Sequence, residues 1–304
     1  MGLNVHAVSR AFGSVRAVNE VSFSVEPGQV IGMVGPNGCG KTTTMLMMVG
    51  LLQPDTGWID VDGNVVVTAD PSHAFSQTQA AAGRALMGWM PDQFGSWDAL
   101  TTEEILTRFA KIYGLANPAA RVAEVIDAFN LQEFSGRRIH TLSRGQKQRL
   151  GFARALIHRP RYLILDEPAN GMDPRARRDL RTFVRTYAQT GAGVVISSHI
   201  LTELDDMVDD AIFMRAGRRV EAAPQSLTSR WDVTALNLDA WREFTRHFAP
   251  TQGVTFTDDA FTAPSNELAG EIIAQACAAG VRFTGVAPAR HDLESRYLAM
   301  EEQS

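Results

Sequence analysis

The sequence predicts an α/β protein, in which a large domain built on a parallel sheet is followed by a small α+β domain. Three observations predict this class. Short apolar runs alternate with helical patterns up to about residue 225, a glycine-rich segment joins one such run to a helix, and the pattern changes after residue 225. With 45% hydrophobic residues, the 304-residue chain is long enough to give both domains a core.

The beginning of the large domain, residues 1–225, is rich in strand patterns. Residues 3–8 and 15–25 alternate apolar and polar side chains, which is typical of strands. Residues 30–34 form a continuous apolar run, which indicates a short buried strand, and the glycine-rich segment leads from it into a helix predicted over residues 42–52. The order is therefore strand, glycine loop, helix.

The rest of the large domain is predicted to contain helices and further strands. After a Gln/Ala-rich stretch at residues 76–82, helical spacing over residues 101–113 and 119–130 indicates an inserted helical region, at about residues 95–158. The runs 105–113 and 122–129 offer apolar faces that either receive a partner protein or form ordinary core packing. Further elements are predicted as a helix at 142–158, a strand at 162–165, a helix at 173–188 that Asp173 and Pro174 begin, and a strand at 194–197.

The small domain, residues 226–304, has a different order of elements. We expect strands at 233–238, 254–257, around Phe261 and at 281–285, with helices at 240–248, 267–279 and 293–300. This order is that of a ferredoxin-like βαββαβ unit with an added helix.

Composition excludes some classes of protein. The net charge of −5 gives no broad basic surface, so nucleic-acid binding is disfavoured. The longest apolar runs fall well short of the roughly 18 residues that cross a membrane, and no secretory signal is visible, so we expect a cytoplasmic chain. Two cysteines, Cys39 and Cys277, predict neither a metal cluster nor a disulfide framework.

The glycine-rich segment matches G-x-x-x-x-G-K-[ST], a phosphate-binding loop, between a predicted strand and helix. Its residues are Gly35, Pro36, Asn37, Gly38, Cys39, Gly40, Lys41 and Thr42, and Thr43 follows. Backbone N–H groups in such a loop curl around phosphates, and the helix amino end adds positive potential. We expect Lys41 to reach the β- and γ-phosphates of ATP and Thr42 to bind Mg²⁺. Cys39 is interpreted as a small space-filler rather than a reactive thiol.

Asp166 and Glu167 follow directly on the apolar strand 162–165, at the edge of the sheet where open α/β folds bind ligands. We expect Asp166 to hold Mg²⁺ through water and Glu167 to accept a proton from, or orient, the water that attacks the γ-phosphate. An acidic pair at this place can also cap the next helix, but the phosphate loop favours the catalytic interpretation.

The segment Leu142-Ser143-Arg144-Gly145-Gln146 decides among the nucleotide-binding families. It resembles the LSGGQ signature of the ATP-binding cassette (ABC) ATPases, with Arg144 where many members have glycine. The resemblance implies a P-loop NTPase cassette with a parallel core, an antiparallel β region and a helical subdomain. It also implies that Ser143, Gly145 and Gln146 contact ATP held by a second subunit.

Three further residues take roles by the same resemblance. Asp173 ends a segment, residues 170–173, in the place of the family's D-loop. His199 is placed like the switch histidine that contacts the γ-phosphate. Phe12 is placed like the aromatic residue that stacks on adenine, although a core residue is the alternative.

One segment departs from the family pattern. After Pro91 the family usually has a glutamine that touches Mg²⁺ and relays the nucleotide state to the membrane partner, whereas this chain has Asp92 followed by Gln93. A carboxylate suits Mg²⁺ equally well, so Asp92 is the metal candidate and Gln93 the alternate.

The resemblance covers about residues 3–225 and implies an ATPase. The small domain is similar to the tail of multidrug and antibiotic-efflux ATPases, so we expect a subunit that energises an exporter as an ATP-driven homodimer, or a heterodimer, peripherally attached to the cell membrane through a permease on a separate chain. An ABC importer ATPase, a soluble ABC mechanoenzyme and a nucleotide-gated regulatory module are the alternatives.

Overall fold

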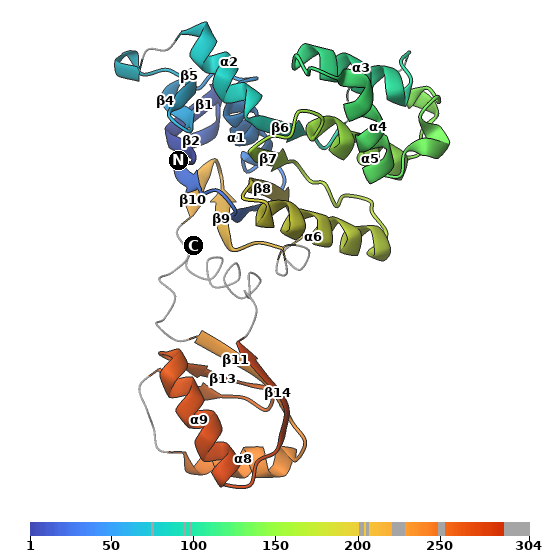
Figure 1. The fold of residues 1–304 in the computed structure, drawn as a ribbon. Helices are drawn as coiled ribbons and strands as arrows, with labels where there is room; N and C mark the ends of the chain where they lie inside the picture. Colours follow the sequence, from blue (N-terminus) through green and yellow to red (C-terminus); the bar gives the residue numbers. More distant parts are fainter. Residues whose placement is uncertain are drawn as a thin grey trace. The chain divides into compact units, whose positions relative to one another are not determined.

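The computed structural model describes residues 1–73, 76–93, 95, 97, 99–200, 204, 207–220, 229–248 and 253–288 (Figure 1). The chain divides into two compact units, Met1–Val220 and Glu221–Ser304. Each unit has its own hydrophobic core.

An antiparallel sheet of four strands, in the order β2-β1-β4-β5, opens the first unit. Its strands are β1 (Leu3–Phe12), β2 (Val15–Val25), β4 (Thr56–Val61) and β5 (Asn64–Thr68). Alternate side chains of β1 and β2 are buried, because successive residues of a strand point to opposite faces. The two strands predicted from this alternation are confirmed.

A six-stranded sheet forms the centre of the first unit, in the order β10-β9-β3-β8-β7-β6. Five of these strands run parallel: β3 (Val30–Val34), β6 (Met87–Met90), β7 (Tyr162–Leu165), β8 (Gly193–Ser198) and β9 (Asp210–Arg215). The sixth, β10 (Arg218–Val220), pairs antiparallel with β9. Every residue of β3, β7 and β8 is buried, which explains the continuous apolar runs of β3 and β7. The predicted parallel core is confirmed.

The helices of the first unit begin where their sequences offer caps. They are α1 (Lys41–Met48), α2 (Gln77–Ala85), α3 (Thr102–Ile112), α4 (Pro118–Ala128), α5 (Arg144–Ala155) and α6 (Pro174–Gln189), with short 3-10 turns at Pro71–His73, Gln132–Phe134 and Ile139–Thr141. Thr101 caps α3 and shares a capping box with Glu104, while Asn117 and Pro118 begin α4.

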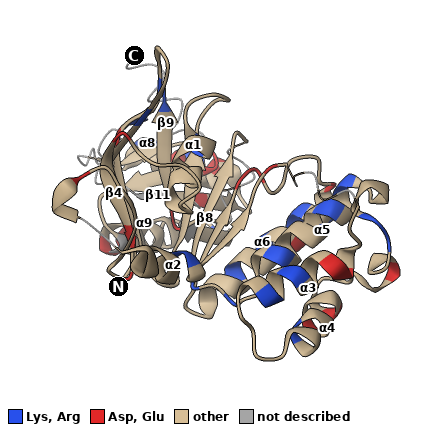
Figure 2. Cartoon of the chain, turned by 90° about the horizontal axis from the view of Figure 1, so that it is seen from above, with Lys and Arg blue, Asp and Glu red and all other residues tan. Residues whose placement is uncertain are grey.

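Helices α3, α4 and α5 lie together beside the sheets (Figure 1), as the predicted helical region requires. Ile105, Leu106, Val122, Val125 and Leu150 are buried in their shared core. The apolar faces of the runs 105–113 and 122–129 therefore serve largely for core packing, which was one of the two interpretations. Basic side chains are frequent on α5 and α6 (Figure 2).

Several elements differ from the sequence prediction. Helix α1 ends at Met48 rather than at residue 52, because Val49 and Gly50 leave the helical conformation and Gly50 takes a left-handed φ of 73°. The Gln/Ala-rich stretch is part of a helix, α2, that Ser76 and Gln79 begin with a capping box. Strands β4, β5, β6, β9 and β10 have no counterpart in the sequence prediction.

The second unit contains the order β11-α8-β12-β13-α9-β14. Its elements are β11 (Ser229–Ala235), α8 (Leu238–His247), β12 (Thr255–Phe256), β13 (Ala260–Ala263), α9 (Asn266–Ala278) and β14 (Phe283–Pro288). The strands pair antiparallel in the order β12-β13-β11-β14, which is the predicted ferredoxin-like arrangement. The helix predicted at 293–300 lies outside the described residues.

The core of the second unit is largely aromatic. Trp241 is 1% exposed and its indole N–H donates to the carbonyl of Thr257 at 2.9 Å, so its polar group is satisfied. Phe261 packs against it from the sheet.

Across the described ranges of the whole chain, no helix combines the length and apolar character needed to span a bilayer.

Candidate functional site

The glycine-rich segment forms a loop between β3 and the amino end of α1. Lys41 is 6% exposed and its side chain turns back over the loop, where Nζ donates to the carbonyl of Gly35 at 2.7 Å and to that of Pro36 at 3.4 Å. Gly35 has a φ of 154°, and a Cβ at this position would overlap the carbonyl oxygen of Met214. The loop backbone therefore passes too close to β9 for any residue larger than glycine.

Cys39 lies inside this loop with 3% of its surface exposed. Its backbone N–H donates to the carbonyl of Pro36 at 3.3 Å, which closes the turn. Burial raises the pKa of the Cys39 thiol above its usual value, although the charge of Lys41 opposes the shift. A neutral buried thiol behaves as a small packing residue, which agrees with the interpretation from sequence.

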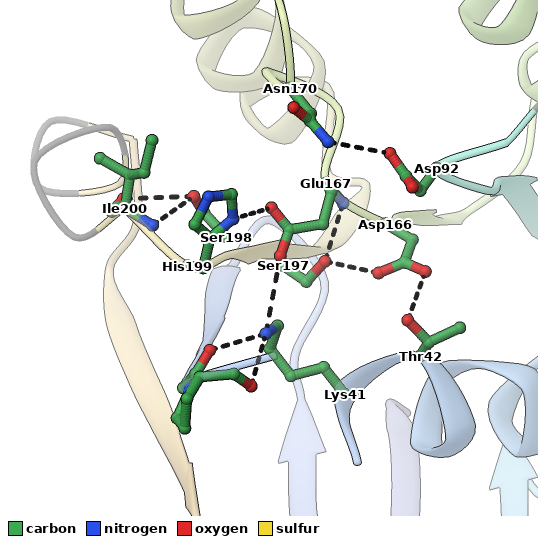
Figure 3. A network of polar contacts seen from close by, with 12 residues as sticks. Lys41, Thr42, Asp92, Asp166, Glu167, Asn170, Ser197, Ser198, His199 and Ile200 are labelled. Atoms are coloured by element: carbon green, nitrogen blue, oxygen red, sulfur yellow. Dashed lines mark hydrogen bonds and ion pairs between the residues drawn. The ribbon is translucent and has the colours of Figure 1, made fainter. Parts of the chain in front are cut away.

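Asp166 and Glu167 emerge from the end of β7 and meet residues of α1 and β8 (Figure 3). Thr42 Oγ1 donates to Asp166 Oδ2 at 2.8 Å, and Ser197 Oγ donates to Asp166 Oδ1 at 2.7 Å. The backbone N–H of Glu167 donates to the same Ser197 Oγ at 2.8 Å. One hydroxyl thus joins the two acidic residues.

Burial raises the pKa of Asp166, while the hydrogen bonds from Ser197 and Thr42 oppose this shift and the charges of Glu167 and Asp92 add to it. The negative charge of a buried carboxylate with acidic neighbours is not balanced by these neighbours. A divalent cation beside Asp166 would supply that charge.

Glu167 is held by two basic side chains. Its Oε2 lies 2.8 Å from Nδ1 of His199. In this hydrogen bond the ring N–H donates and the carboxylate oxygen accepts. Its Oε1 lies 3.6 Å from Nζ of Lys41. The backbone of Glu167 has a φ of 48°, an unusual conformation for a residue other than glycine, and such strain gathers at functional sites.

One carboxylate oxygen of Glu167, the one that lies near Lys41, is unsatisfied by hydrogen bonds. Its Oε1 is buried and has no hydrogen-bond partner among the described residues. A buried acceptor without a donor is costly, and a water molecule between the carboxylate and a nucleotide would satisfy it. The residues therefore fit a nucleotide with a nucleophilic water beside Glu167.

The same residues fit Mg²⁺. Thr42, Asp166 and Asp92 offer a hydroxyl and carboxylates, the hard oxygen donors that this cation prefers. Asp92 Oδ1 accepts a hydrogen bond from Nδ2 of Asn170 at 3.3 Å and lies on the side of Asp166 away from Lys41 (Figure 3). Asp92 and its alternate, Gln93, are both exposed.

The signature residues lie at the amino end of α5. Ser143 is the N-cap: its Oγ accepts from the backbone N–H of Gln146 at 3.3 Å, and its own N–H donates to Gln146 Oε1 at 2.9 Å. A Cβ on Gly145 would meet no atom within 4 Å, so the helix end faces open space. In the described part of the chain, no hydrogen bond joins Ser143, Gly145 or Gln146 to the phosphate loop.

Asp173 begins α6. Its Oδ1 accepts from the backbone N–H groups of Arg175 at 2.9 Å and Ala176 at 2.8 Å, which is the capping role that the sequence indicated. Within one chain, Asp173 therefore has a structural role as a helix cap. Among the described residues, no hydrogen bond joins its side chain to the phosphate loop.

The remaining candidates, Phe12 and Thr43, differ in exposure. Phe12 ends β1 and is 51% exposed, with the guanidinium carbon of Arg10 5.2 Å from its ring centre. It is not a core residue, and a planar ligand has access to the part of its ring that Arg10 does not cover. Thr43 is half-buried within α1.

Ser197 and Asn170 are two polar residues of the site that are not among the residues predicted from sequence. A signal for Ser197 exists, because it is the last residue but one of β8, the parallel neighbour of β7, and the carboxyl ends of neighbouring parallel strands meet at one edge. Asn170 has no comparable signal, since it lies in a loop and its contact with Asp92 depends on the path of two loops.

Comparison with known proteins identifies the family. The model of the family described as "ABC transporter" matches residues 18–170. The Nod factor export ATP-binding protein I of Burkholderia orbicola (strain AU 1054) is 36% identical over 224 residues, which cover 72% of this chain and 70% of the relative. The bacitracin transport ATP-binding protein BcrA of Bacillus licheniformis is 34% identical over 218 residues, with 71% and 68% covered.

A further relative is the linearmycin resistance ATP-binding protein LnrL of Bacillus subtilis (strain 168), which is 34% identical over 209 residues; the match covers 68% of this chain and 64% of the relative. Among solved structures, an ATP-binding subunit of an ABC transporter aligns with a TM-score of 0.64 and 24% identity over 91% of this chain and 100% of that one. A dimeric ATP-binding cassette with bound ADP and phosphate aligns with a TM-score of 0.63 and 21% identity, over 72% and 97%. By its fold, its family match and these relatives, the chain belongs to the ABC transporter family as one of its nucleotide-binding, ATP-hydrolysing subunits.

Proposed function

We propose that this chain is the ATPase subunit of an ABC exporter and that it works with a permease on a separate polypeptide. The observation that carries the proposal is the cluster of Lys41, Thr42, Asp166, Glu167 and His199, which is suited to ATP hydrolysis. The direction of transport is supported by the relatives, whose names describe Nod factor export, bacitracin transport and linearmycin resistance.

In the proposed reaction, the oxygen of a water molecule attacks the γ-phosphorus of ATP, the bond from this phosphorus to the β–γ bridging oxygen breaks, and ADP leaves with that oxygen. Glu167 orients the water and takes its proton, and the Nδ1–H of His199 holds the carboxylate in place. Lys41 gives up its carbonyl contacts in the loop to reach the β- and γ-phosphates.

Thr42, Asp166 and Asp92 are the residues that would hold Mg²⁺. When bound, the cation neutralises negative charge on the phosphate oxygens. Ser197 keeps Asp166 oriented for this task, since its hydroxyl is fixed at the same time by the backbone of Glu167.

The exposed amino end of α5 is proposed to bind the nucleotide of a second copy of the chain. We propose that Ser143, Gly145 and Gln146 of one copy close over ATP in the phosphate loop of the other, with Asp173 nearby and Phe12 stacked on the adenine. ATP then joins two copies, closure drives the permease into its alternate state, and hydrolysis at Glu167 reopens the dimer. A heterodimer with a different cassette would use the same contacts.

Residues 1–225 are assigned the nucleotide-binding role and residues 226–304 an accessory role. The chain is placed at the cytoplasmic face of the membrane through its permease. A soluble mechanoenzyme and an importer ATPase differ from this proposal in their partners and in the direction of transport, so both are outcomes of the test.

The test is purification of the tagged full chain carrying Glu167→Gln from detergent-solubilised native membranes with ATP, followed by mass spectrometry. We expect a polytopic membrane protein in stoichiometric amount, and little of it with Lys41→Ala, which should not hold ATP. Recovery of soluble partners alone would contradict the exporter role. Reconstitution of the complex in vesicles then separates the directions, since an importer would move its cargo toward the ATP-binding side.

A further inference from the structure

The hairpin that joins β1 and β2 carries two exposed apolar side chains close to the phosphate loop. Phe12 and Val15 are cross-strand partners, and they are 51% and 65% exposed. Further along β2, the carbonyl oxygen of Ala17 lies so close to the loop that a Cβ on Gly40 would overlap it. Two residues of a strand span roughly 7 Å, so the end of the hairpin lies within the length of one nucleotide from the loop.

Asp55 fixes the end of β1 on the side that faces β4. In the described sheet the pairing of β1 with β4 ends at Ser9 and Thr56, so the last residues of β1 extend beyond their neighbour. There the backbone N–H of Ala11 donates to Asp55 Oδ2 at 2.7 Å, and the N–H of Asp55 donates to the carbonyl of Ser9 at 2.7 Å. The aspartate thus takes the place of a strand partner just before Phe12.

Arg10 joins this aspartate to the aromatic ring. Its Nη1 donates to Asp55 Oδ1 at 2.8 Å, and its guanidinium carbon lies 5.2 Å from the ring centre of Phe12, within the range of a cation–π contact. Its Nε is buried and has no hydrogen-bond partner among the described residues. Because a buried donor without an acceptor is costly, the hydrogen bonds of Arg10 alone do not explain where its guanidinium lies.

Asp55 also connects this ring to the helix that carries the phosphate loop. Only residues 49–54 separate Asp55 from the end of α1. This segment is held against the helix, since the N–H groups of Leu51 and Leu52 both donate to the carbonyl of Leu46, at 2.9 and 3.2 Å. One short and well-fixed segment therefore links the helix of the phosphate loop to the ring at the end of the hairpin.

We propose that Arg10 and Asp55 are positioning residues for the nucleotide base: they hold the Phe12 ring so that its uncovered part stacks on the base while the phosphates lie in the loop. The inference rests on the proposed function, in which Phe12 stacks on adenine. A ring that is already fixed loses less conformational entropy when the ligand binds. Arg10 and Asp55 act through the ring and its strand and need not touch the nucleotide.

The first experiment measures binding of two ligands to the full chain in the Glu167→Gln background by isothermal titration with Mg²⁺. ADP carries the base, whereas tripolyphosphate carries phosphates alone. Arg10→Ala should weaken binding of ADP about 3- to 10-fold, because the ring is no longer held, and should leave binding of tripolyphosphate unchanged. Arg10→Lys keeps the charge and should restore part of the affinity.

Asp55→Asn and a control variant complete this experiment. Asp55→Asn keeps an acceptor for the N–H of Ala11 but removes the charge that holds Arg10, so it should weaken ADP less than Arg10→Ala does and leave tripolyphosphate unchanged. Arg242→Ala removes an arginine that forms an ion pair with Asp258 in the second unit. As the matched control, it should leave both affinities unchanged.

The second experiment tests that Arg10 acts through the ring. Phe12→Ala should weaken ADP roughly tenfold or more, because the stacking surface is lost. Adding Arg10→Ala to Phe12→Ala should then cause no further loss, since residues that act through one contact are not additive. A general loosening of the hairpin would instead weaken the double variant further.

The outcomes separate this inference from the function on which it rests. If Phe12→Ala binds ADP like the parent, Phe12 does not stack on the base, and both the stacking and this inference are wrong. If Phe12→Ala weakens ADP but Arg10→Ala does not, or Arg10→Ala weakens tripolyphosphate equally, the positioning role is wrong while the stacking stands. If Arg10→Ala does not fold, Asp55→Asn and Arg10→Lys decide by the same comparison of the two ligands.

Discussion

At the scale of single residues, Ser197 determines how the two acidic side chains stand. Its hydroxyl has no surface exposed, donates to Asp166 and accepts from the backbone of Glu167. Both donor and acceptor capacity of the hydroxyl are used within one site. Residues of this kind orient groups that touch the substrate, although they do not touch it themselves.

Ser197→Ala should therefore lower the turnover number for ATP roughly 10-fold or more, since Asp166 loses its orientation, while the affinity for ATP changes much less. Steady-state ATPase kinetics measure both. Ser135→Ala removes a surface hydroxyl that donates only to the carbonyl of Gln132, and it should leave turnover unchanged. Equal turnover in Ser197→Ala and the parent would show that Asp166 needs no such support.

At the scale of elements, the phosphate loop depends on the close approach of its backbone to β9. Gly35→Ala places a Cβ against the carbonyl of Met214 at a φ of 154°, so the loop must shift. Thermal unfolding should show a loss of stability of about 1–3 kcal/mol, and ATP binding should weaken. Gly136→Ala, whose Cβ meets no atom within 4 Å, should melt like the parent; an equally stable Gly35→Ala would mean that the loop is not constrained.

His158, which follows the C-terminal end of α5, should make the stability of the fold depend on pH. His158 stacks on Tyr113 with ring centres 3.7 Å apart and its Nε2–H donates to the carbonyl of Met87 at 3.0 Å. Burial lowers the pKa of His158 from 6.5 to about 4. Because the folded chain resists protonation here, the contribution of His158 to stability is complete above pH 6.5 and declines as the pH falls toward about 4.

His158→Gln keeps a donor and removes the titration, so its melting temperature should fall less than that of the parent between pH 7 and pH 5. Differential scanning fluorimetry across this range measures the difference. His247→Gln changes a histidine whose side chain is 73% exposed on α8 and should follow the parent. A parent and a His158→Gln variant with parallel curves would contradict the assignment.

Elements with a strong local signal could be predicted from sequence, and those that depend on partners could not. Both bounds of strand β7 are predicted correctly, because four apolar residues precede an acidic pair. The start of α6 is predicted because Asp173 and Pro174 mark it. Strands β4 and β5 pair antiparallel through a turn of Asp62 and Gly63, a hairpin signal that the sequence carries although neither strand is predicted from it. Strand β9 has four consecutive buried apolar residues, 211–214, and pairs in parallel with β3, but the sequence prediction does not include it.

The same division applies to the site. Lys41, Thr42, Asp166 and Glu167 belong to motifs with fixed spacing, and the structure brings them together. The bond between Asp92 and Asn170 joins residues 78 positions apart and could not be read from spacing. The packing of Arg144 on Gly171 likewise depends on the tertiary path of a loop.

At the scale of the whole molecule, all the candidate site residues, from Phe12 to His199, lie in the first unit. The second unit has a separate core around Trp241 and Phe261. Compact units with separate cores generally fold alone.

A chain shortened to residues 1–225 should therefore melt cooperatively and bind ATP within about twofold of the full chain's affinity. Isothermal titration and thermal unfolding measure these properties. A shortened chain that is unfolded, or that no longer binds ATP, would show that residues 226–304 are part of the nucleotide-binding structure rather than an accessory.

The central claim is that ATP joins two copies of this chain around sites in which Glu167 performs hydrolysis. Light scattering after size-exclusion chromatography of Glu167→Gln, with and without saturating ATP and Mg²⁺, tests it most directly. The account predicts the mass of one 33.2 kDa chain without nucleotide and of two chains with ATP. A Glu167→Gln chain that binds ATP and remains a monomer, or one that hydrolyses ATP at the parent's rate, would contradict it.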